Sequence, residues 1–406
     1  MRGRRDMVWF VIVGLLLAAA IFGLQKIERH QAVQPKSVAL TFKGDARNSL
    51  AFTWYTEVPG LQGVVQVAEG AQPPDSWEGD RILTFAAESA EIAIGNGKRQ
   101  GVHKAEATGL IPGTAYVYRL GSGKNGGWSE PAGFVTEAAE AETFSFINVA
   151  DSQGVTAADF KLWGRTLDKA FAVFQDVRFI VHNGDLTEEP ENEQGWDAFF
   201  GQAGQWLSRV PLLPVTGNHD EMAGEAERFT SHFNLPDNGA KGSAPGTTYS
   251  FDYGYAHFVM LDTESNLKRQ TDWLRDDLQK NGKPWTIVAM HRPAYGGNQY
   301  EKAEDWIKVF DEYGVDLVLQ GHNHEYSRSY PLRSGEIVPA GEGTVYVVTN
   351  TAGPKFNELK KDKFYHAVHF QNDKQMFAGI TVSERSLSYE AYDADGNKLD
   401  EVVLTR

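Results

Sequence analysis

The sequence predicts an α/β domain of layered strands flanked by helices, preceded by a small all-β sandwich and an N-terminal apolar helix. Three observations predict this fold class. The chain has 406 residues, more than one hydrophobic core usually organises, so two folded units are expected. From Val38 the chain shows period-two strand patterns and no good helical period before about Glu137. From Phe144 onward, strand and helix patterns alternate.

The first 30 residues are expected to form a signal anchor. Three arginines within the first five residues precede an uncharged apolar run at 7–24, which is just long enough to cross a bilayer as a helix. The arginine-rich side should stay in the cytoplasm, which places the rest of the chain outside. The alternative is a cleaved signal peptide and a secreted protein, because Ala18 and Ala20 form an A-x-A pattern. Residues 31–37 are polar and predict a tether.

Residues 38–136 are expected to form the all-β sandwich. Leu50, Phe52 and Trp54 occupy every second position, which is typical of a strand with one buried face. The segments VVQVA and YVYRLG show similar patterns, and Pro-Gly and Gly-Gly pairs supply turns between strands. The sequence therefore predicts a short-stranded sandwich here.

The acidic, alanine-rich segment TEAAEAET at 136–143 marks the expected domain boundary. Residues 144–406 are expected to form the second domain, including strands at the C-terminus. Apolar residues at helical spacing predict helices over 163–174 and 303–313. Beyond Gly379 the pattern returns to strands, with a hairpin turn at 395–396.

The composition restricts the function. The formal net charge of −15 argues against a protein that binds nucleic acid as such, because sequence-independent binding to phosphates needs a basic surface. An anionic substrate must then meet a local positive charge, which bound metal ions can supply. The sequence contains no cysteine, which excludes disulfides, thiolate metal sites and thiol nucleophiles.

Ligand-type side chains follow successive apolar strands of the second domain. They are Asp151, Asp185, Asn218, His291, His322 and His324. Because the carboxyl ends of strands in an α/β sheet converge on a crevice, these residues can meet there. Carboxylates, imidazoles and an amide oxygen suit first-row metal ions. The set is too large for one tetrahedral site, so two ions about 3.5 to 4 Å apart, sharing one carboxylate, are expected.

Each of these residues has a structural alternative. A single Asp after a strand usually caps a turn or a helix, and His291 alone fits a core position. The string Gly-Asn-His-Asp could be a polar turn. His322 and His324 are harder to explain this way, because two histidines in a turn can point to different metals. The coincidence at five successive strand ends favours the metal site.

The order of the motifs D-x-Q, GD, GNHD, H and GHxH resembles the calcineurin-like metallophosphoesterase superfamily over about 144–354. The segments FTWYT, TGLIPGTAYVYRLG, WSEPAGFVT and YSFDYGYAHFVMLDTE resemble the purple acid phosphatase branch of that superfamily. This resemblance covers nearly the whole chain after the apolar run. It implies a fibronectin-III-like sandwich at 38–136, followed by a β-sandwich metallophosphoesterase domain flanked by helices.

The resemblance also implies roles for the ligand-type residues. Asp185 would bridge two divalent or mixed-valence ions of iron, manganese or zinc. Asp151 and His324 would bind the first ion. The second ion would be held by Asn218, His291 and His322.

The resemblance further implies two catalytic residues. His219 would contact the phosphoryl group or protonate the leaving oxygen, and Asp220 would orient its imidazole. A metal-bound hydroxide would attack phosphorus in line, so that no protein nucleophile is needed.

Two positions depart from the family pattern. Gln153 stands where the wider superfamily usually has a histidine, and it either ligates weakly through its amide oxygen or leaves a coordination position to water. Glu188 stands where purple acid phosphatases have a ligating tyrosine. Without that tyrosine we expect no charge-transfer band and therefore a colourless protein.

Further residues are candidates for binding substrate. Arg292 and Arg328 could contact the non-bridging phosphate oxygens, with a surface ion pair as the alternative for each. Tyr326 could line the substrate entrance. The remaining histidines, including His366 and His369, are expected to be structural.

The sequence therefore predicts an extracytoplasmic hydrolase of phosphate monoesters. A phosphodiesterase or nucleotidase with the same metals is an alternative, because the metal motifs do not distinguish these substrates. A binding or adhesion protein is an alternative of another class, in which Gln153 and Glu188 mark a decayed site.

Overall fold

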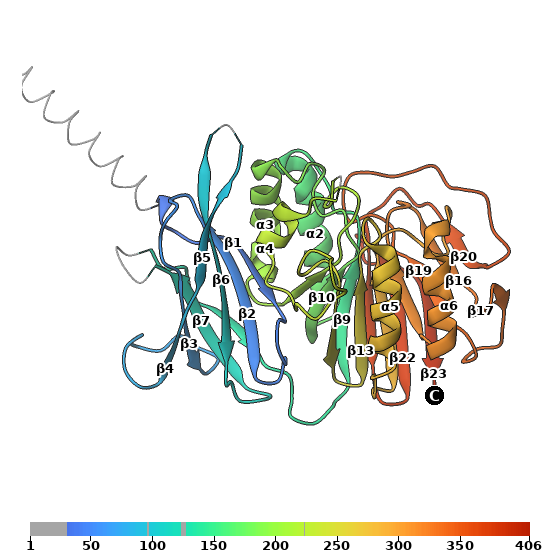
Figure 1. The fold of residues 1–406 in the computed structure, drawn as a ribbon, viewed down its shortest axis with the longest axis horizontal. Coiled ribbons are helices and arrows are strands. Elements are labelled where there is room, and N and C mark those ends of the chain that lie inside the picture. Colours follow the sequence, from blue (N-terminus) through green and yellow to red (C-terminus); the bar gives the residue numbers. More distant parts are fainter. Residues whose placement is uncertain (1–30, 96, 123–126, 223) are drawn as a thin grey trace, which may run out of the picture.

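The structure, a computed structural model, describes residues 31–95, 97–122, 127–222 and 224–406. The first part of the chain forms a β-sandwich, at the left of Figure 1, and the rest forms a larger domain of packed sheets and helices. The predicted α/β fold with a β-rich N-terminal part is thus confirmed. The predicted N-terminal apolar helix lies outside the described residues. Within the described ranges, no helix is long and apolar enough to cross a membrane.

Two four-stranded antiparallel sheets form the N-terminal sandwich. The first sheet contains, in spatial order, β1 (Lys36–Thr41), β2 (Ser49–Thr56), β6 (Arg99–Thr108) and β5 (Glu88–Ala93). The second contains β4 (Ile82–Ala86), β3 (Val64–Glu69), β7 (Ala115–Gly121) and β8 (Ala132–Val135). Leu50, Phe52 and Trp54 lie in β2 and belong to the core, as their spacing predicts.

The prediction of one buried face for β2 is wrong, because every residue of β2 is buried. The face opposite the sandwich core packs on the larger domain. There the ring of Tyr55 stacks on His232, with ring centroids 4.5 Å apart.

Two large sheets form the second domain. The six-stranded sheet contains, in order, β11 (Leu212–Pro214), β10 (Val177–His182), β9 (Phe144–Val149), β21 (Met376–Val382), β22 (Ser386–Asp393) and β23 (Lys398–Thr405). The seven-stranded sheet contains β12 (Tyr249–Tyr253), β13 (Ala256–Leu261), β14 (Trp285–Met290), β15 (Leu317–Gln320), β19 (Val345–Val348), β16 (Tyr326–Ser329) and β20 (His366–Phe370). A two-stranded ribbon joins β17 (Leu332–Arg333) to β18 (Glu336–Ile337).

Parallel pairing within these sheets positions the strand ends that matter for function. β9, β10 and β11 are parallel neighbours in the six-stranded sheet. β13, β14, β15 and β19 are parallel neighbours in the seven-stranded sheet. The two sheets pack through aromatic side chains. Phe146 stacks on Phe179 of its own sheet at 5.1 Å, and its ring meets the edge of Phe258 from the other sheet at 5.3 Å.

Helices cover the outer faces of both large sheets (Figure 1). The helices near the six-stranded sheet are α2 (Ala157–Val173), α3 (Glu193–Leu207) and the short α4 (Glu227–His232). The seven-stranded sheet is covered by α5 (Leu267–Leu278), η1 (Glu301–Ala303) and α6 (Glu304–Tyr313). Both helices predicted from apolar spacing are confirmed. α2 begins with a capping box between Thr156 and Asp159, which satisfies otherwise free backbone N–H groups.

The sandwich and the larger domain share one continuous hydrophobic core. Phe42, just after β1, packs against Phe179, Phe251 and Tyr253 of the larger domain at centroid distances of 5.7, 5.8 and 5.7 Å. Polar contacts reinforce this junction, since Lys104 Nζ donates to the carbonyls of Thr230 and Phe233 at 2.6 and 2.8 Å. The two units are therefore firmly docked on each other.

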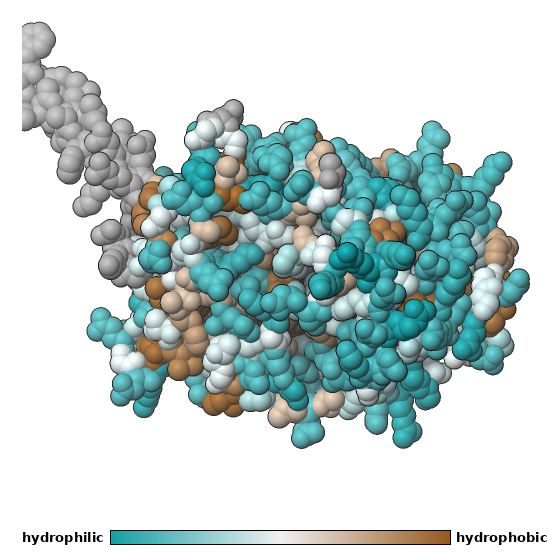
Figure 2. Space-filling view, in the orientation of Figure 1, coloured by the Kyte–Doolittle hydropathy of each residue, from teal (hydrophilic) through white to brown (hydrophobic). Residues whose placement is uncertain are grey.

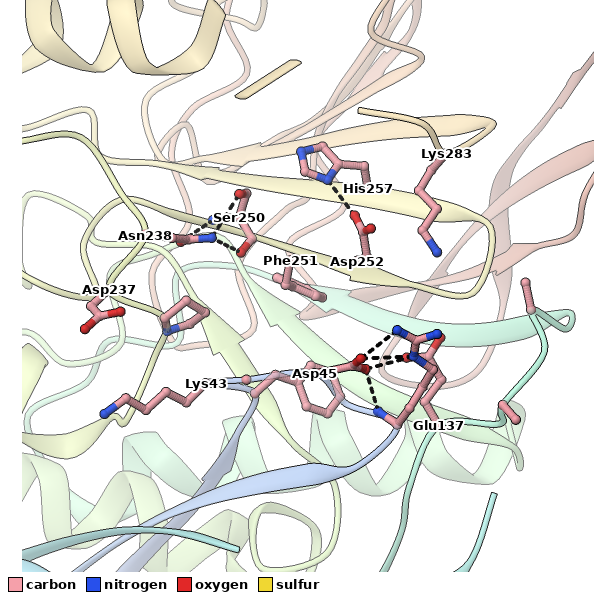
Figure 3. A pocket seen from close by; sticks show the side chains of 16 residues that line it. Lys43, Asp45, Glu137, Asp237, Asn238, Ser250, Phe251, Asp252, His257 and Lys283 are labelled. Atoms are coloured by element: carbon pink, nitrogen blue, oxygen red, sulfur yellow. Dashed lines mark hydrogen bonds and ion pairs between the residues drawn. The ribbon is translucent and has the colours of Figure 1, made fainter. Parts of the chain in front are cut away.

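The surface shown in Figure 2 is dominated by hydrophilic residues, in keeping with the net charge of −15. A polar pocket of about 420 Å³ opens at the junction of the two units (Figure 3). Its walls carry charged side chains from both units, including Asp45, Glu137, His257 and Lys283. No residue predicted to bind metal or substrate lines this pocket.

Candidate metal centre

The six predicted ligands lie together at strand ends of both large sheets. Asp151, Asp185 and Asn218 follow the parallel strands β9, β10 and β11 of the six-stranded sheet. His291 follows β14, and His322 and His324 follow its parallel neighbour β15 in the seven-stranded sheet. The expected crevice is therefore formed by the carboxyl ends of strands from two packed sheets.

The backbone is strained where it presents these side chains. Asp151, Asp185, His322 and His324 have φ values of +53°, +55°, +70° and +50°. Residues other than glycine rarely adopt this left-handed region, and such strain concentrates at functional sites. Half of the eight such residues in the described chain are candidate ligands. The left-handed backbone thus allows these four side chains to point toward one another, at a cost in local stability.

Two motif glycines make room for the carboxylates. A Cβ at Gly217 would lie 2.2 Å from Asp185 Oδ1, and a Cβ at Gly321 would lie 2.9 Å from Asp151 Oδ2. Any side chain at either position would displace a candidate ligand. This explains the glycines that precede Asn218 and His322 in the sequence.

Asp185, His291 and His322 form one ligand group, with one ligand atom of each within 4.8 Å of the others. His291 Nε2 lies 3.2 Å from Asp185 Oδ2 and 3.2 Å from His322 Nδ1. Asn218 Oδ1 approaches the same His291 nitrogen at 3.3 Å. Two oxygens and two nitrogens thus surround one point, a donor set that fits a divalent first-row ion.

Asp151, Asp185 and His324 form a second group within the same 4.8 Å limit. His324 Nε2 lies 3.5 Å from Asp151 Oδ1. Gln153 joins this group, because its Nε2 lies 3.1 Å from Asp185 Oδ2 and 3.4 Å from His324 Nε2. Its buried Oε1 has no hydrogen-bond partner among the described residues. A half-turn of the amide would point that oxygen at the group. Asp185 is common to both groups, as a bridging carboxylate must be.

Backbone carbonyls orient two of the imidazoles. His291 Nδ1 donates to the carbonyl of Asn183 at 2.8 Å, and His324 Nδ1 donates to the carbonyl of Lys355 at 3.0 Å. In each ring Nε2 is therefore the nitrogen free to accept a metal. Sequence reasoning missed both Asn183 and Lys355. Asn183 adjoins the GD motif, but Lys355 gives no signal in the sequence.

Charge is tightly balanced within the cluster. Burial would lower the pKa of His291, but Asp185 and Asp151 outweigh burial and raise that pKa to about 10. Burial would raise the pKa of Asp185, whereas His291 and His219 hold it well below its usual range. Burial, together with His291 and Arg292, lowers the pKa of His322 to about 3. A metal ion that binds here must displace the His291 proton. The affinity for the metal should therefore weaken as the pH is lowered.

His219 lies at the edge of the cluster with a side chain that is 29 % exposed. Its Nδ1 donates to the carbonyl of Glu188 at 2.8 Å, which leaves Nε2 for a ligand. The prediction that Asp220 orients this imidazole is wrong. The buried Asp220 carboxylate accepts backbone N–H groups of Asp185, Leu186 and Gly217 at 2.7, 3.0 and 2.9 Å. Asp220 therefore braces the turn that carries Asp185.

The three predicted substrate residues differ in their positions. Arg292 reaches the cluster, since its Nη1 lies 3.2 Å from His322 Nε2 while Glu264 holds its Nε at 2.8 Å. Tyr326 is fully buried and donates to Asp400 at 2.7 Å. Arg328 is paired with the same carboxylate at 2.6 and 2.9 Å. The predictions for Tyr326 and Arg328 are therefore wrong, because Asp400 already engages both groups.

Known proteins resemble both halves of this chain. The calcineurin-like phosphoesterase family matches residues 145–326, and the purple acid phosphatase N-terminal domain matches residues 35–136. Human acid phosphatase type 7 is 26 % identical over 382 residues, which cover 83 % of this chain and 82 % of the human protein. Purple acid phosphatase 15 of Arabidopsis thaliana is 28 % identical over 62 % of this chain and 53 % of its own length.

A solved structure supports the same fold. A purple acid phosphatase from yellow lupin (Lupinus luteus) seeds superposes with a TM-score of 0.79 at 18 % identity, covering 92 % of this chain and 75 % of the lupin chain. The chain thus carries a purple acid phosphatase N-terminal domain followed by a calcineurin-like phosphoesterase domain, which contains the candidate ligands, and it is homologous to the acid and purple acid phosphatases.

Proposed function

We propose that this protein hydrolyses phosphate monoesters at a two-metal centre. The observation that carries the proposal is the pair of ligand groups that share Asp185. Asp185 would bridge the ions, Asp151, His324 and Gln153 would hold the first, and the second would be held by Asn218, His291 and His322. When bound, two such ions neutralise phosphoryl charge and supply a nucleophile from water at neutral pH.

The chain's own residues would bind and orient the substrate around this centre. The protonated imidazole of His219 would donate Nε2–H to a phosphoryl or leaving-group oxygen, because the Glu188 carbonyl accepts the N–H of the other ring nitrogen. Arg292 is held toward His322 by Glu264, so its guanidinium can bind a non-bridging oxygen. Buried carboxylates and imidazoles fix the ligand atoms before substrate arrives, which lowers the cost of reaching the reactive geometry.

The decisive test is metal-dependent turnover in matched variants. Metal-stripped protein should regain hydrolysis of p-nitrophenyl phosphate with Mn²⁺, Zn²⁺ or Fe²⁺, and Asp185→Asn should lose it. Asp316→Asn is the matched control, because Asp316 is a half-buried carboxylate, paired with Arg406, that precedes β15 at the opposite strand end from His322. Full turnover in Asp185→Asn would refute the bridge, and failure of every metal would favour a binding or adhesion role.

Substrate class needs a separate measurement, since the metal ligands are common to monoesterases, phosphodiesterases and nucleotidases. We expect kcat/KM for p-nitrophenyl phosphate to exceed that for its bis-ester. The reverse order would identify a phosphodiesterase.

We further propose a colourless centre, because Glu188 stands at the position of the ligating tyrosine of purple acid phosphatases. A strong visible band in the metal-loaded protein would contradict this.

We also propose an extracytoplasmic location, with residues 1–30 as a membrane anchor. The arginines before the apolar run at 7–24 support this orientation. The untreated protein should then be found in the membrane fraction. Protease added to intact cells should digest its folded part. Release into the medium would instead show that the segment is cleaved, and a protected cytoplasmic protein would refute the proposal.

A further inference from the structure

A second cluster of ligand-type side chains lies outside the candidate metal centre, at the start of β20. Asp362, His366 and His369 each offer a ligand atom, and these atoms all lie within 4.8 Å of one another. Asp362 Oδ1 is 2.7 Å from His369 Nδ1 and 3.9 Å from His366 Nδ1. From the sequence alone both histidines were expected to be structural.

An irregularity in β20 brings the two histidines together. Residues three apart in a regular strand point to opposite faces of the sheet. β20 pairs with β16 with a register shift, so that Val368 faces Arg328 while His366 faces Ser329. Such a bulge re-aims a side chain, and the two imidazole rings lie with centroids 4.1 Å apart. Their side chains are 4 % and 2 % exposed, so the cluster has a rigid, buried base.

A buried carboxylate stands behind His369. Glu325 is fully buried, and its Oε1 lies 3.6 Å from His369 Nε2. Neither atom has a hydrogen-bond partner among the described residues. A histidine that binds metal through one nitrogen commonly donates its other N–H to a carboxylate. Glu325 is placed to accept that proton on the side away from Asp362.

We propose that Asp362, His366 and His369 bind a divalent transition-metal ion such as Zn²⁺, at a site separate from the two-metal centre. The ligand atoms would be Asp362 Oδ1 and both Nδ1 nitrogens, with water in the open position. In a tetrahedral zinc site neighbouring ligand atoms lie about 3.3 Å apart, between the 2.7 and 3.9 Å separations seen here. The Asp362 side chain is 85 % exposed and has room to close this difference.

An ion would displace little to reach His366. The Nδ1 of His366 accepts only the N–H of Lys363 among the described residues, at 3.2 Å, and the ion would displace this single bond.

The ion would fasten a loop that supports the two-metal centre. Residues 354–365 run beside the strand end that carries His324. Lys355 accepts the Nδ1 proton of His324 at 3.0 Å, and Lys360 N–H donates to Glu325 Oε2 at 2.8 Å. An ion joining Asp362 to β20 would fix the far end of this loop. This positioning role rests on the proposed function, whereas binding of the ion does not.

The test counts bound Zn²⁺ per chain in the metal-stripped full-length protein, by calorimetric titration and elemental analysis. The wild-type chain should bind three equivalents, and Asp362→Asn should bind two. Glu358→Gln, which changes an exposed carboxylate in the same loop, should still bind three. Because Asp362 is exposed, its variant should fold. Equal stoichiometry in wild type and Asp362→Asn would overturn the proposal.

A second arm separates this site from the two-metal centre. The double variant Asp185→Asn with Asp362→Asn should bind one equivalent less than Asp185→Asn alone. Zn²⁺ should also slow hydrogen exchange of residues 354–365 in Asp185→Asn but not in the double variant. Exchange that does not respond to Zn²⁺ would overturn the loop-fastening role. If both Asp185 variants retained full phosphatase activity, the proposed function would be refuted. The measured stoichiometry at Asp362 would be unaffected by that outcome.

Discussion

At the residue scale, the candidate centre was predictable because side chains that can bind metal recur at successive strand ends. Aspartates, an asparagine and histidines at successive strand ends identify potential ligands, and the structure brings all six together. The orienting groups were not predictable, because Asn183 and Lys355 act through backbone carbonyls that every residue possesses. The role of Asp220 was misassigned for the same reason. Its partners are backbone N–H groups, which carry no sequence signal.

Asp220→Asn tests the bracing role of this carboxylate. Each oxygen of Asp220 accepts at least one backbone N–H, so an amide would turn one NH₂ group toward a donor. We expect a loss of about 1 to 3 kcal/mol in the free energy of unfolding and weaker metal binding, measured by urea denaturation and metal titration. His219→Gln should lower turnover with stability and metal content unchanged. If Asp220→Asn left both stability and metal content unaltered, the bracing role of Asp220 would be refuted.

Gln153→His tests how the first metal is held. The amide of Gln153 already faces Asp185 and His324, so a histidine there would direct a stronger donor to the same point. We expect the first ion to bind about tenfold or more tightly, measured by competition with a chelating dye. Gln153→Ala should weaken binding if the amide oxygen ligates and leave it unchanged if water takes that position. Equal affinity in Gln153→His would place residue 153 outside the coordination sphere.

At the scale of elements, periodicity located strands and helices well, but it did not show what covers their outer faces. The spacing in β2 identified its inner face correctly, yet α4 buries the other face through Tyr55 and His232. The bulge in β20 was equally hidden, because it arises from pairing with β16. Both features depend on contacts between segments far apart in the chain, and local pattern carries no information about these.

Ionic contacts join His257 of β13 to β12 and to α5 and should make stability depend on pH. His257 lies between Asp252 and Asp277, each 2.7 Å from one ring nitrogen. Burial would lower the pKa of His257, but the bonds to both carboxylates raise it to about 9. Because the folded pKa exceeds the unfolded value of about 6.5, this stabilisation is complete below pH 6.5 and is lost as pH rises through 9.

His257→Gln should therefore destabilise the protein by up to about 3 kcal/mol near pH 6, and by much less near pH 10. Urea denaturation at both pH values measures the difference. His103→Gln is the comparison, since burial lowers the pKa of His103 to about 4 and its contribution should not decrease between these pH values. A deficit for His257→Gln that is the same at pH 6 and pH 10 would show that the ring acts through packing alone.

At the scale of the whole molecule, the acidic segment at 136–143 predicted a boundary between two units, and composition alone did not reveal how firmly they dock. β8 ends at Val135 and β9 begins at Phe144, so the segment does connect two sets of sheets. However, Glu137 within it is buried and accepts the N–H of Gly254 at 2.7 Å. The sandwich and the larger domain thus share a core, because Phe42 inserts among aromatic residues of the second unit.

Cooperative unfolding of both units is the consequence of this shared core. We expect residues 31–406 to unfold in a single calorimetric transition, and Phe42→Ala to lower the free energy of unfolding by about 3 to 5 kcal/mol or to split the transition in two. Phe364→Ala is the matched control, because this phenylalanine is 65 % exposed and its truncation should change stability little. Two separate transitions in the unmodified protein, with Phe42→Ala affecting only the one that belongs to the sandwich, would show that the units fold independently despite their contact.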